Sequence, residues 1–142
     1  MTLKELQEQV KTDLKIDGSE LTFEAIRTPE IHHTYNKMFM TEKMAFKKLE
    51  REWDQLYLER WEYYRKKAEP EVYQEKPLLK KILDTDVKYY LAADEELQEL
   101  RSKMDNKEEL IDFLKRTMDS IAMRQWLIKA ANDNNRYLVG DK

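Results

Sequence analysis

The sequence predicts an all-α protein built from long helices, and three observations support this. Its 142 residues include only 2 Gly and 3 Pro, so few turns can be built and the regular structure must come in long pieces. Charged residues make up 39 % of the chain and, with Leu, Met, Ala and Gln, they are good helix formers. Apolar residues also recur at spacings of three and four, as they do along one face of a helix.

The first helix is expected to begin after Thr2, because Thr2 and Glu5 have the spacing of a capping box. Its apolar residues Leu3, Leu6, Val10 and Leu14 share one stripe. Asp17-Gly18 is expected to end this helix, and a short helical stretch over residues 19–27 follows.

A much longer helix is expected over residues 29–68, since Thr28-Pro29 offers a capping residue followed by Pro at the first helical position. Nothing breaks the pattern before Pro70, so this helix spans on the order of 60 Å at ~1.5 Å per residue. Its apolar seam contains Phe46, Leu49, Trp53 and Leu56, and Arg60 occupies the next position. This pattern assigns Trp53 to packing.

The C-terminal helical part is expected over residues 78–132. Residues 71–76, between two prolines, are interpreted as a loop, and residues 78–83 and 87–93 as helical. Asp94 can cap a further helix that Asp105-Asn106 interrupts, and residues 132–135 are expected to end the last one. That last helix carries a seam made of Ile111, Leu114, Met118, Ile121, Gln125 and Ile128.

These elements predict one domain over residues 1–142, an elongated helical bundle. A chain with so much charge and so little apolar surface encloses a core more easily by packing against copies of itself. A homo-oligomer is therefore predicted, and a monomeric helical bundle is the alternative. The expected oligomer interface is the apolar seam of the last helix: Ile111, Leu114, Met118, Ile121 and Ile128.

Several function classes lack the residues that they need. There is no Cys, no Gly-rich phosphate loop and no Gly-x-Ser-x-Gly motif, so no enzyme activity and no cofactor are expected. Glu30 and His33 form one Glu-x-x-His pair, but a di-iron bundle needs a second, so no metal site is expected. No apolar run approaches the ~20 residues of a membrane span. The N-terminus is amphipathic rather than a signal peptide, which predicts a cytosolic protein.

The basic residues concentrate in the middle of the chain. Residues 37–81 carry 12 basic and 9 acidic side chains (net +3), whereas residues 1–36 carry 4 and 7 and residues 82–142 carry 10 and 13 (net −3 each). Basic strips interleaved with aromatic rings hold single strands by phosphate pairing and base stacking. The candidate DNA-binding residues are Arg60, Trp61, Tyr63, Tyr64, Arg65, Lys66 and Lys67, with Lys43, Lys47, Lys48 and Arg51 as an earlier basic group. The cluster also has a structural interpretation, because cations favour a helix C-terminus and aromatic rings pack against neighbours.

The sequence resembles the UvsY family of phage recombination mediators. The N-terminal part of the resemblance rests on Leu6, Gln7, Glu8, Lys11, Asp13, Ile16, Asp17, Leu21, Glu24 and Ala25. The middle part rests on Arg60 and the pair Tyr63-Tyr64. The C-terminal part rests on Leu110, Asp112, Phe113, Asp119, Ile121, Arg124, Ile128 and Lys129. These positions are colinear over nearly the whole chain.

The resemblance implies a ring-shaped homo-oligomer, expected to be a heptamer, that binds single-stranded DNA and hydrolyses nothing. It also implies two protein partners, a RecA-like phage recombinase and the phage single-strand-binding protein, in the cytoplasm of the infected host cell. Such a mediator loads recombinase onto strands that the binding protein covers. The alternative is a structural coiled-coil scaffold or interaction protein without nucleic-acid binding.

The chain departs from the family pattern in its charge. The pattern is basic overall, whereas this chain has a net charge of −3. Leu58 stands where the pattern has a basic residue, two positions before Arg60, and Glu59 adds an acid between them. Each lost cation removes about one counterion-release contribution to DNA affinity. Binding is therefore expected to depend on several weak contacts, with Trp61 rather than Trp53 near the DNA.

Overall fold

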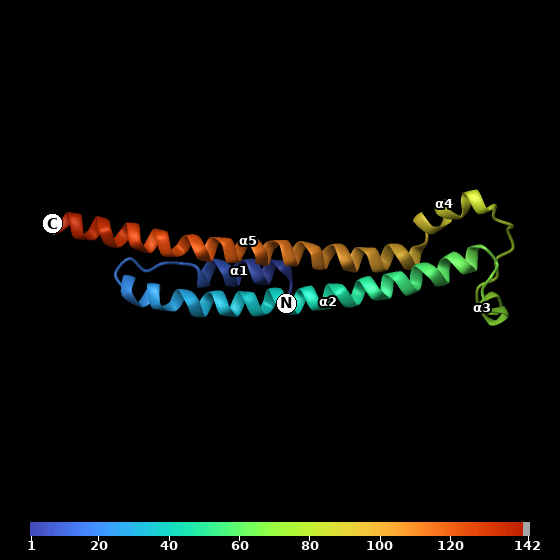
Figure 1. Cartoon of the computed structure of the whole chain (residues 1–142), viewed down its shortest axis with the longest axis horizontal. Coiled ribbons are helices and arrows are strands. Elements are labelled where there is room, and N and C mark those ends of the chain that lie inside the picture. The colour runs from blue at the N-terminus through green and yellow to red at the C-terminus, as the bar shows by residue number, and fades with distance from the viewer. Residues whose placement is uncertain (141–142) are drawn as a thin grey trace. The chain divides into compact units, whose positions relative to one another are not determined.

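The computed structural model describes residues 1–140 and confirms the all-α prediction, because this part of the chain contains helices and no strands (Figure 1). In chain order the elements are α1 (Leu3–Asp13), α2 (Leu21–Tyr64), α3 (Pro70–Glu75), the 3-10 turn η1 (Asp84–Asp86), α4 (Val87–Ala92) and α5 (Glu95–Leu138). Two of them, α2 and α5, are 44 residues long each.

The chain divides into two compact units that share these long helices. Unit 1 comprises Met1–Lys43 and the chain from Glu109 onward, and unit 2 comprises Met44–Glu108. Unit 1 therefore contains α1, the first part of α2 and the second part of α5. Unit 2 contains the remainder of both long helices together with α3, η1 and α4.

The core of unit 1 forms where α1 lies against α2 and α5. Leu6 of α1 is buried with Ile31 and Tyr35 of α2 and with Leu114 and Ile121 of α5. The predicted capping box is confirmed: the Thr2 hydroxyl accepts the Glu5 N–H at 3.2 Å, and the Glu5 carboxylate accepts the Thr2 N–H at 3.0 Å. The helix ends at Asp13, four residues before the predicted stop at Asp17.

The prediction that a helix begins at Thr28-Pro29 is wrong, because α2 runs through both residues. Thr28 does not cap; its hydroxyl donates back to the Glu24 carbonyl at 3.0 Å. Proline removes one helical hydrogen bond and crowds the preceding turn. At this turn the buried Arg124 of α5 donates to the Glu24 carbonyl and to the Thr28 hydroxyl, at 2.6 Å each. The carbonyl that loses its helical donor at Pro29 is that of Ala25, so the bonds from Arg124, 96 residues after Thr28, tie the turn before the proline to α5 rather than replace the missing one.

Other boundaries also differ from the prediction. Residues 78–83 are not helical, and most of the segment predicted as a loop at 71–76 is the short helix α3. The expected interruption at Asp105-Asn106 is absent, and α5 continues to Leu138 rather than ending at residues 132–135. Asp and Asn cost a helix at most ~0.7 kcal/mol each. Burial of Met104 next to this position stabilises the helix by more than that.

The core of unit 2 is small and rich in aromatic rings. Val87, Leu91 and Leu97 are buried, and Trp53, Leu56, Trp61, Tyr64 and Ile82 pack against them. The prediction that Asp94 caps a helix is confirmed, since its Oδ1 accepts the Leu97 N–H at 3.0 Å in the first turn of α5. This core holds the C-terminal end of α2 against α4 and the start of α5.

Candidate nucleic-acid interface

The candidate interface lies in unit 2 around the C-terminal end of α2, and Arg60 is at its centre. Nε of Arg60 donates to Oδ2 of Asp94 at 2.7 Å, and the same oxygen accepts the Tyr64 hydroxyl at 2.7 Å. The Arg60 guanidinium also lies over the ring of Tyr63, 4.4 Å from its centroid. The Arg60 side chain is only 13 % exposed. Its charge is thus used to join α2 to the first turn of α5.

Asp94 stays ionised in this buried position. Burial by itself raises the pKa of a carboxyl group, but hydrogen bonds from Tyr64, the Leu97 N–H and Arg60 outweigh it and hold the Asp94 pKa below its ordinary value. Burial and the neighbouring Asp94 raise the pKa of Tyr64. Arg60, Tyr64 and Asp94 therefore form an internal charged network, in which Asp94 accepts hydrogen bonds from the other two side chains.

The next turn of α2 presents a cationic surface built over one aromatic ring. The Arg65 guanidinium lies 4.7 Å from the ring centre of Trp61, and the Lys67 ammonium lies 5.6 Å from it. Arg65 also pairs with Asp84 at 2.9 Å, which ties the segment before α4 to the end of α2. Trp61 is half-buried beneath these two cations, so it supports the cationic surface rather than offering an open ring face.

Lys66, two residues after the end of α2, has an unusual backbone conformation. Its φ is +57°, the left-handed region that glycine usually occupies after a helix. The Lys66 N–H donates to the Tyr63 carbonyl at 3.1 Å, and the Lys67 N–H donates to the Glu62 carbonyl at 2.8 Å. These two bonds form a Schellman motif. Lys66 is exposed, so this strained backbone holds an open cation at the end of the helix.

Tyr63 has a structural role. It is 6 % exposed, and its hydroxyl donates to the Lys76 carbonyl at 3.0 Å. The Tyr73 hydroxyl donates to the Tyr63 carbonyl at 3.0 Å, and the two rings meet edge to face at 5.4 Å. These contacts fold α3 back onto the end of α2.

The earlier basic group divides between the units. Lys47, Lys48 and Arg51 are exposed on the part of α2 in unit 2, and none of them forms an ion pair within residues 1–140. Lys43 belongs to unit 1, where its ammonium lies 5.3 Å from the ring centre of Phe39.

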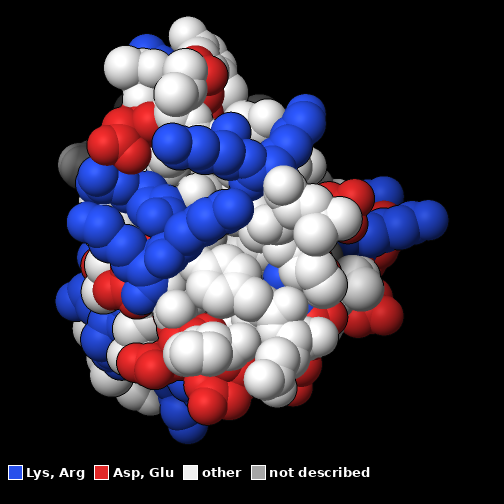
Figure 2. Space-filling view, turned by 90° about the vertical axis from the view of Figure 1, so that its right-hand side faces the viewer, with Lys and Arg blue, Asp and Glu red and all other residues white. Residues whose placement is uncertain are grey.

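Sequence reasoning missed three further cations of unit 2. Lys80 and Lys81 are exposed in the segment that was expected to be helical, and Lys88 is exposed on α4. Asp84 and Ile82 of the same segment contact the end of α2 and the unit 2 core, which brings this segment to the interface. Figure 2 faces the end that carries α3 and α4, and Lys and Arg gather along one side of it, beside uncharged surface.

Most of the predicted oligomer-interface residues are covered within one chain. Leu114 and Ile121 are each 1 % exposed in the unit 1 core, and Ile128 is buried as well. Met118 packs against the same core, and Ile111 is half-buried. Different residues of α5 are open to solvent: Met123, Trp126 and Leu127 are 60–67 % exposed.

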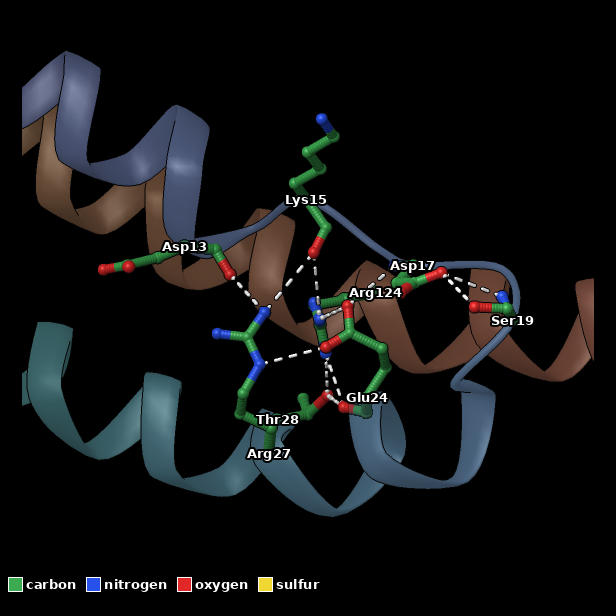
Figure 3. A network of polar contacts seen from close by, with 8 residues as sticks. All are labelled: Asp13, Lys15, Asp17, Ser19, Glu24, Arg27, Thr28 and Arg124. Atoms are coloured by element: carbon green, nitrogen blue, oxygen red, sulfur yellow. Dashed lines mark hydrogen bonds and ion pairs between the residues drawn. The ribbon is translucent and has the colours of Figure 1, made fainter.

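Four of the residues that carry the family resemblance meet in a polar network in unit 1 (Figure 3). Arg124, fully buried, donates to Oε2 of Glu24 at 2.9 Å, and the same oxygen accepts the Asp17 N–H at 3.0 Å. Arg27 pairs with Oε1 of Glu24 at 3.0 Å and donates to the Asp13 carbonyl at 2.9 Å. The network closes the connection between α1 and α2 onto α5, so these residues have a structural role.

Burial by itself would raise the pKa of the Glu24 carboxyl group. The hydrogen bonds from Arg27 and the Asp17 N–H, with the charges of Arg27 and Arg124, more than compensate and hold its pKa below the ordinary value. The Glu24 carboxyl group is therefore ionised at neutral pH.

Two other kinds of site are absent from residues 1–140. No helix in this range has both the length and the apolar character that a membrane span requires. Within the same range, no three His, Cys, Asp or Glu side chains are arranged to hold a metal ion.

Comparison with known proteins supports the resemblance. Residues 9–141 match the sequence model of a family described as "Recombination, repair and ssDNA binding protein UvsY". A search of curated protein sequences gave no significant match.

Crystal structures of the bacteriophage T4 recombination mediator protein UvsY share the fold. In lattice type II the TM-score is 0.87 at 22 % identity, covering 98 % of each chain. In lattice type I it is 0.85 at 21 % identity, covering 94 % of this chain and 98 % of the other. In lattice type IV it is 0.82 at 22 % identity, covering 96 % and 98 %.

Proposed function

The chain belongs to the UvsY family of recombination, repair and single-stranded-DNA-binding proteins, and from this we propose that it is a recombination mediator. In this role it binds single-stranded DNA and promotes the loading of a RecA-like recombinase onto strands that a single-strand-binding protein covers. The family match over residues 9–141 is the observation that carries the proposal.

The proposed DNA contact is the cationic surface formed by Arg65, Lys66 and Lys67, with Lys80 and Lys81 in the segment that Asp84 ties to Arg65. Lys66 and Lys67 are exposed and without an ion pair among the described residues, so phosphates can approach them. In this proposal Arg60, Tyr63 and Tyr64 position the surface, because their polar groups are bound to other parts of the chain. Lys47, Lys48 and Arg51 extend the contact along α2.

Phosphate contacts alone carry no sequence preference, so binding is expected to be sequence-independent and to weaken steeply with salt. The acidic residues Glu59, Glu62 and Glu69 lie close in sequence to the cations and reduce the local potential. Each site is therefore weak, and several copies on one strand raise the effective concentration. A ring-shaped homo-oligomer would present several copies of the surface to one strand.

We further propose that copies associate through the exposed apolar residues of α5 in unit 1. Trp126 is 67 % exposed and Leu127 is 60 % exposed, and clustered apolar surface of this kind is typical of protein interfaces. Replacing both by Ser should lower the sedimenting mass and leave the helical circular dichroism spectrum unchanged. Tyr137→Ser, at a residue 79 % exposed, is the control. An unchanged mass in the double variant would place the interface elsewhere.

The function is tested with a RecA-like recombinase whose ATPase activity depends on bound single-stranded DNA. Covering the strand with single-strand-binding protein lowers that activity, and adding this protein should restore it. The variant Lys66→Asn with Lys67→Gln, which retains a residue that tolerates the left-handed backbone, should restore it less. If the unmodified protein restores no activity and binds no single strand, the proposal is wrong.

A further inference from the structure

A shallow groove of about 280 Å³ lies between α2, α4 and α5 of unit 2, and the function proposed above does not use it. Trp53 and Tyr57 of α2 form one wall, and Leu91 and Leu97 contribute to the rest of the lining. Lys88 and Arg101 also line it. We propose that this groove is a nucleobase-stacking subsite for single-stranded DNA, an inference that rests on the proposed DNA-binding function.

The aromatic wall offers a ring surface for stacking. The centroids of Trp53 and Tyr57 are 6.1 Å apart, and their planes are inclined by 33°. Tyr57 is 42 % exposed, although it lies one turn after a tryptophan that packs on the unit 2 core. Aromatic rings that are held at one edge and open at the other bind bases without sequence preference, because every base has a π-face.

The volume suits a group smaller than a whole ligand. Sites for whole small molecules usually measure roughly 300–1,000 Å³, and this groove of about 280 Å³ is just smaller. It is also open to solvent rather than enclosed, as a site for one base of a continuous strand must be.

The charge of the lining complements a nucleotide. Lys88 has no ion pair among residues 1–140, and its ammonium lies 5.1 Å from the ring centre of Tyr89. Within the described residues Arg101 pairs only with Asp105, at 3.5 Å, and both side chains are more than half exposed. Exposed pairs of this kind are weak, so a phosphate can replace Asp105. The Arg101 guanidinium already lies 5.9 Å from the ring centre of Trp53.

Unit 2 has a second groove, which is less suited to a DNA strand than the groove beside Trp53. It measures about 390 Å³ and is lined by Glu52, Glu59, Glu96 and Glu99, with Lys103. Four carboxylates repel phosphates. The groove beside Trp53 has a comparable size, contains two cations and no carboxylate in its lining, and is walled by aromatic rings.

This inference reverses the roles that the sequence suggested for the two tryptophans. Two cations lie over the ring of Trp61, Arg65 at 4.7 Å and Lys67 at 5.6 Å. The ring of Trp53 has one among residues 1–140, Arg101 at 5.9 Å, and it lines a groove that is open to solvent. Fluorescence can separate them, because the chain has only three Trp residues. The variant with Trp61→Phe and Trp126→Phe retains Trp53 as its only tryptophan.

The first experiment titrates this single-tryptophan protein with oligo(dT) at low salt. The emission of Trp53 should be quenched, and added salt should reverse the quenching. The second experiment measures the affinity of single substitutions in the otherwise unmodified protein by fluorescence anisotropy of labelled oligo(dT). Tyr57→Ser and Lys88→Gln should each weaken binding several-fold.

Each variant has a matched control. Tyr137→Ser removes an exposed tyrosine from unit 1, and Lys103→Gln removes a cation from the acidic groove. Both controls should bind as the unmodified protein does, and circular dichroism should show the same helix content in all four variants.

The outcomes separate this inference from the function on which it rests. If the unmodified protein binds oligo(dT), but Trp53 emission does not change and Tyr57→Ser binds as tightly as Tyr137→Ser, the subsite is refuted and the DNA-binding function stands. If the unmodified protein does not bind oligo(dT), both are refuted.

Discussion

The guanidinium of Arg60 lies 2.7 Å from the carboxylate of Asp94, and this pair joins the last turns of α2 to the first turn of α5. The Asp94 side chain is 2 % exposed, and it also accepts hydrogen bonds from Tyr64 and from the Leu97 N–H. One carboxylate thus caps a helix, binds a cation and orders an aromatic ring. The cationic surface of Arg65, Lys66 and Lys67 follows directly on α2, so its position depends on this pair.

Replacing Asp94 by Asn should lower the free energy of unfolding at pH 7 by about 3 kcal/mol, because a buried cation loses its partner. Asn still caps the helix, so the loss of stability measures the contribution of the Asp94 charge. The folded-state pKa of Asp94 is depressed, so its charge stabilises the fold above the unfolded pKa of 3.8 and ceases to do so as the pH falls through the folded pKa.

Urea unfolding of both proteins at several pH values checks this, and the difference between them should shrink below pH ~4. Asp84→Asn is the control, since Asp84 is 73 % exposed in its pair with Arg65. This replacement should lower the free energy of unfolding by less than about 1 kcal/mol. A difference that stays constant down to pH ~2 would contradict the assignment.

Replacing Lys66 by Gly should raise the stability of the protein by up to about 1 kcal/mol, because glycine adopts a φ of +57° without steric cost. Lys66→Ala retains the strain and should show no such gain. Both variants lose the same cation, so both should bind oligo(dT) more weakly and to a similar degree. Thermal unfolding and anisotropy measure the two effects separately. Equal stabilities for the Gly and Ala variants would mean that the backbone at this residue is not strained.

Replacing Leu58 by Lys should strengthen binding to single-stranded DNA. Leu58 is 54 % exposed, so the change removes little buried surface, and it restores the cation that the family pattern has two positions before Arg60. The slope of log affinity against log salt should steepen by about 0.7 if the new cation meets one phosphate. Leu58→Gln controls for the loss of the apolar side chain. Identical slopes for Lys and Gln would show that no phosphate passes this position.

Replacing Arg124 by Met should destabilise the protein by about 3–5 kcal/mol, because it removes one partner of the buried Glu24 carboxylate. It also removes the donor that binds the Glu24 carbonyl and the Thr28 hydroxyl beside Pro29. The double variant with Glu24→Gln should lose less than the sum of the two single variants, since the unpaired charge is then gone. Urea unfolding of the four proteins gives this coupling, and additive losses would contradict a shared network.

Interactions between residues close together in the chain could be predicted from the sequence. The capping box of Thr2 and Glu5 and the cap at Asp94 join residues three apart, and both are confirmed. The apolar seam of α5 was also identified, because a spacing of three and four defines one helical face. The seam alone could not show which surface covers it, and for Leu114 and Ile121 this is the same chain's α1 and α2.

The sequence by itself determined that the chain is all-helical, that the helices are long and that the cations gather near the end of α2. Only the tertiary structure decided how these side chains are used. Arg60 was predicted to contact DNA because its partner Asp94 lies 34 residues further on, and the sequence around Thr28 gave no sign of Arg124, 96 residues away, which binds the turn before Pro29. Helix formation follows from contacts within a turn. Pairing of charges depends on burial and on which elements meet, and these arise only when the whole chain packs.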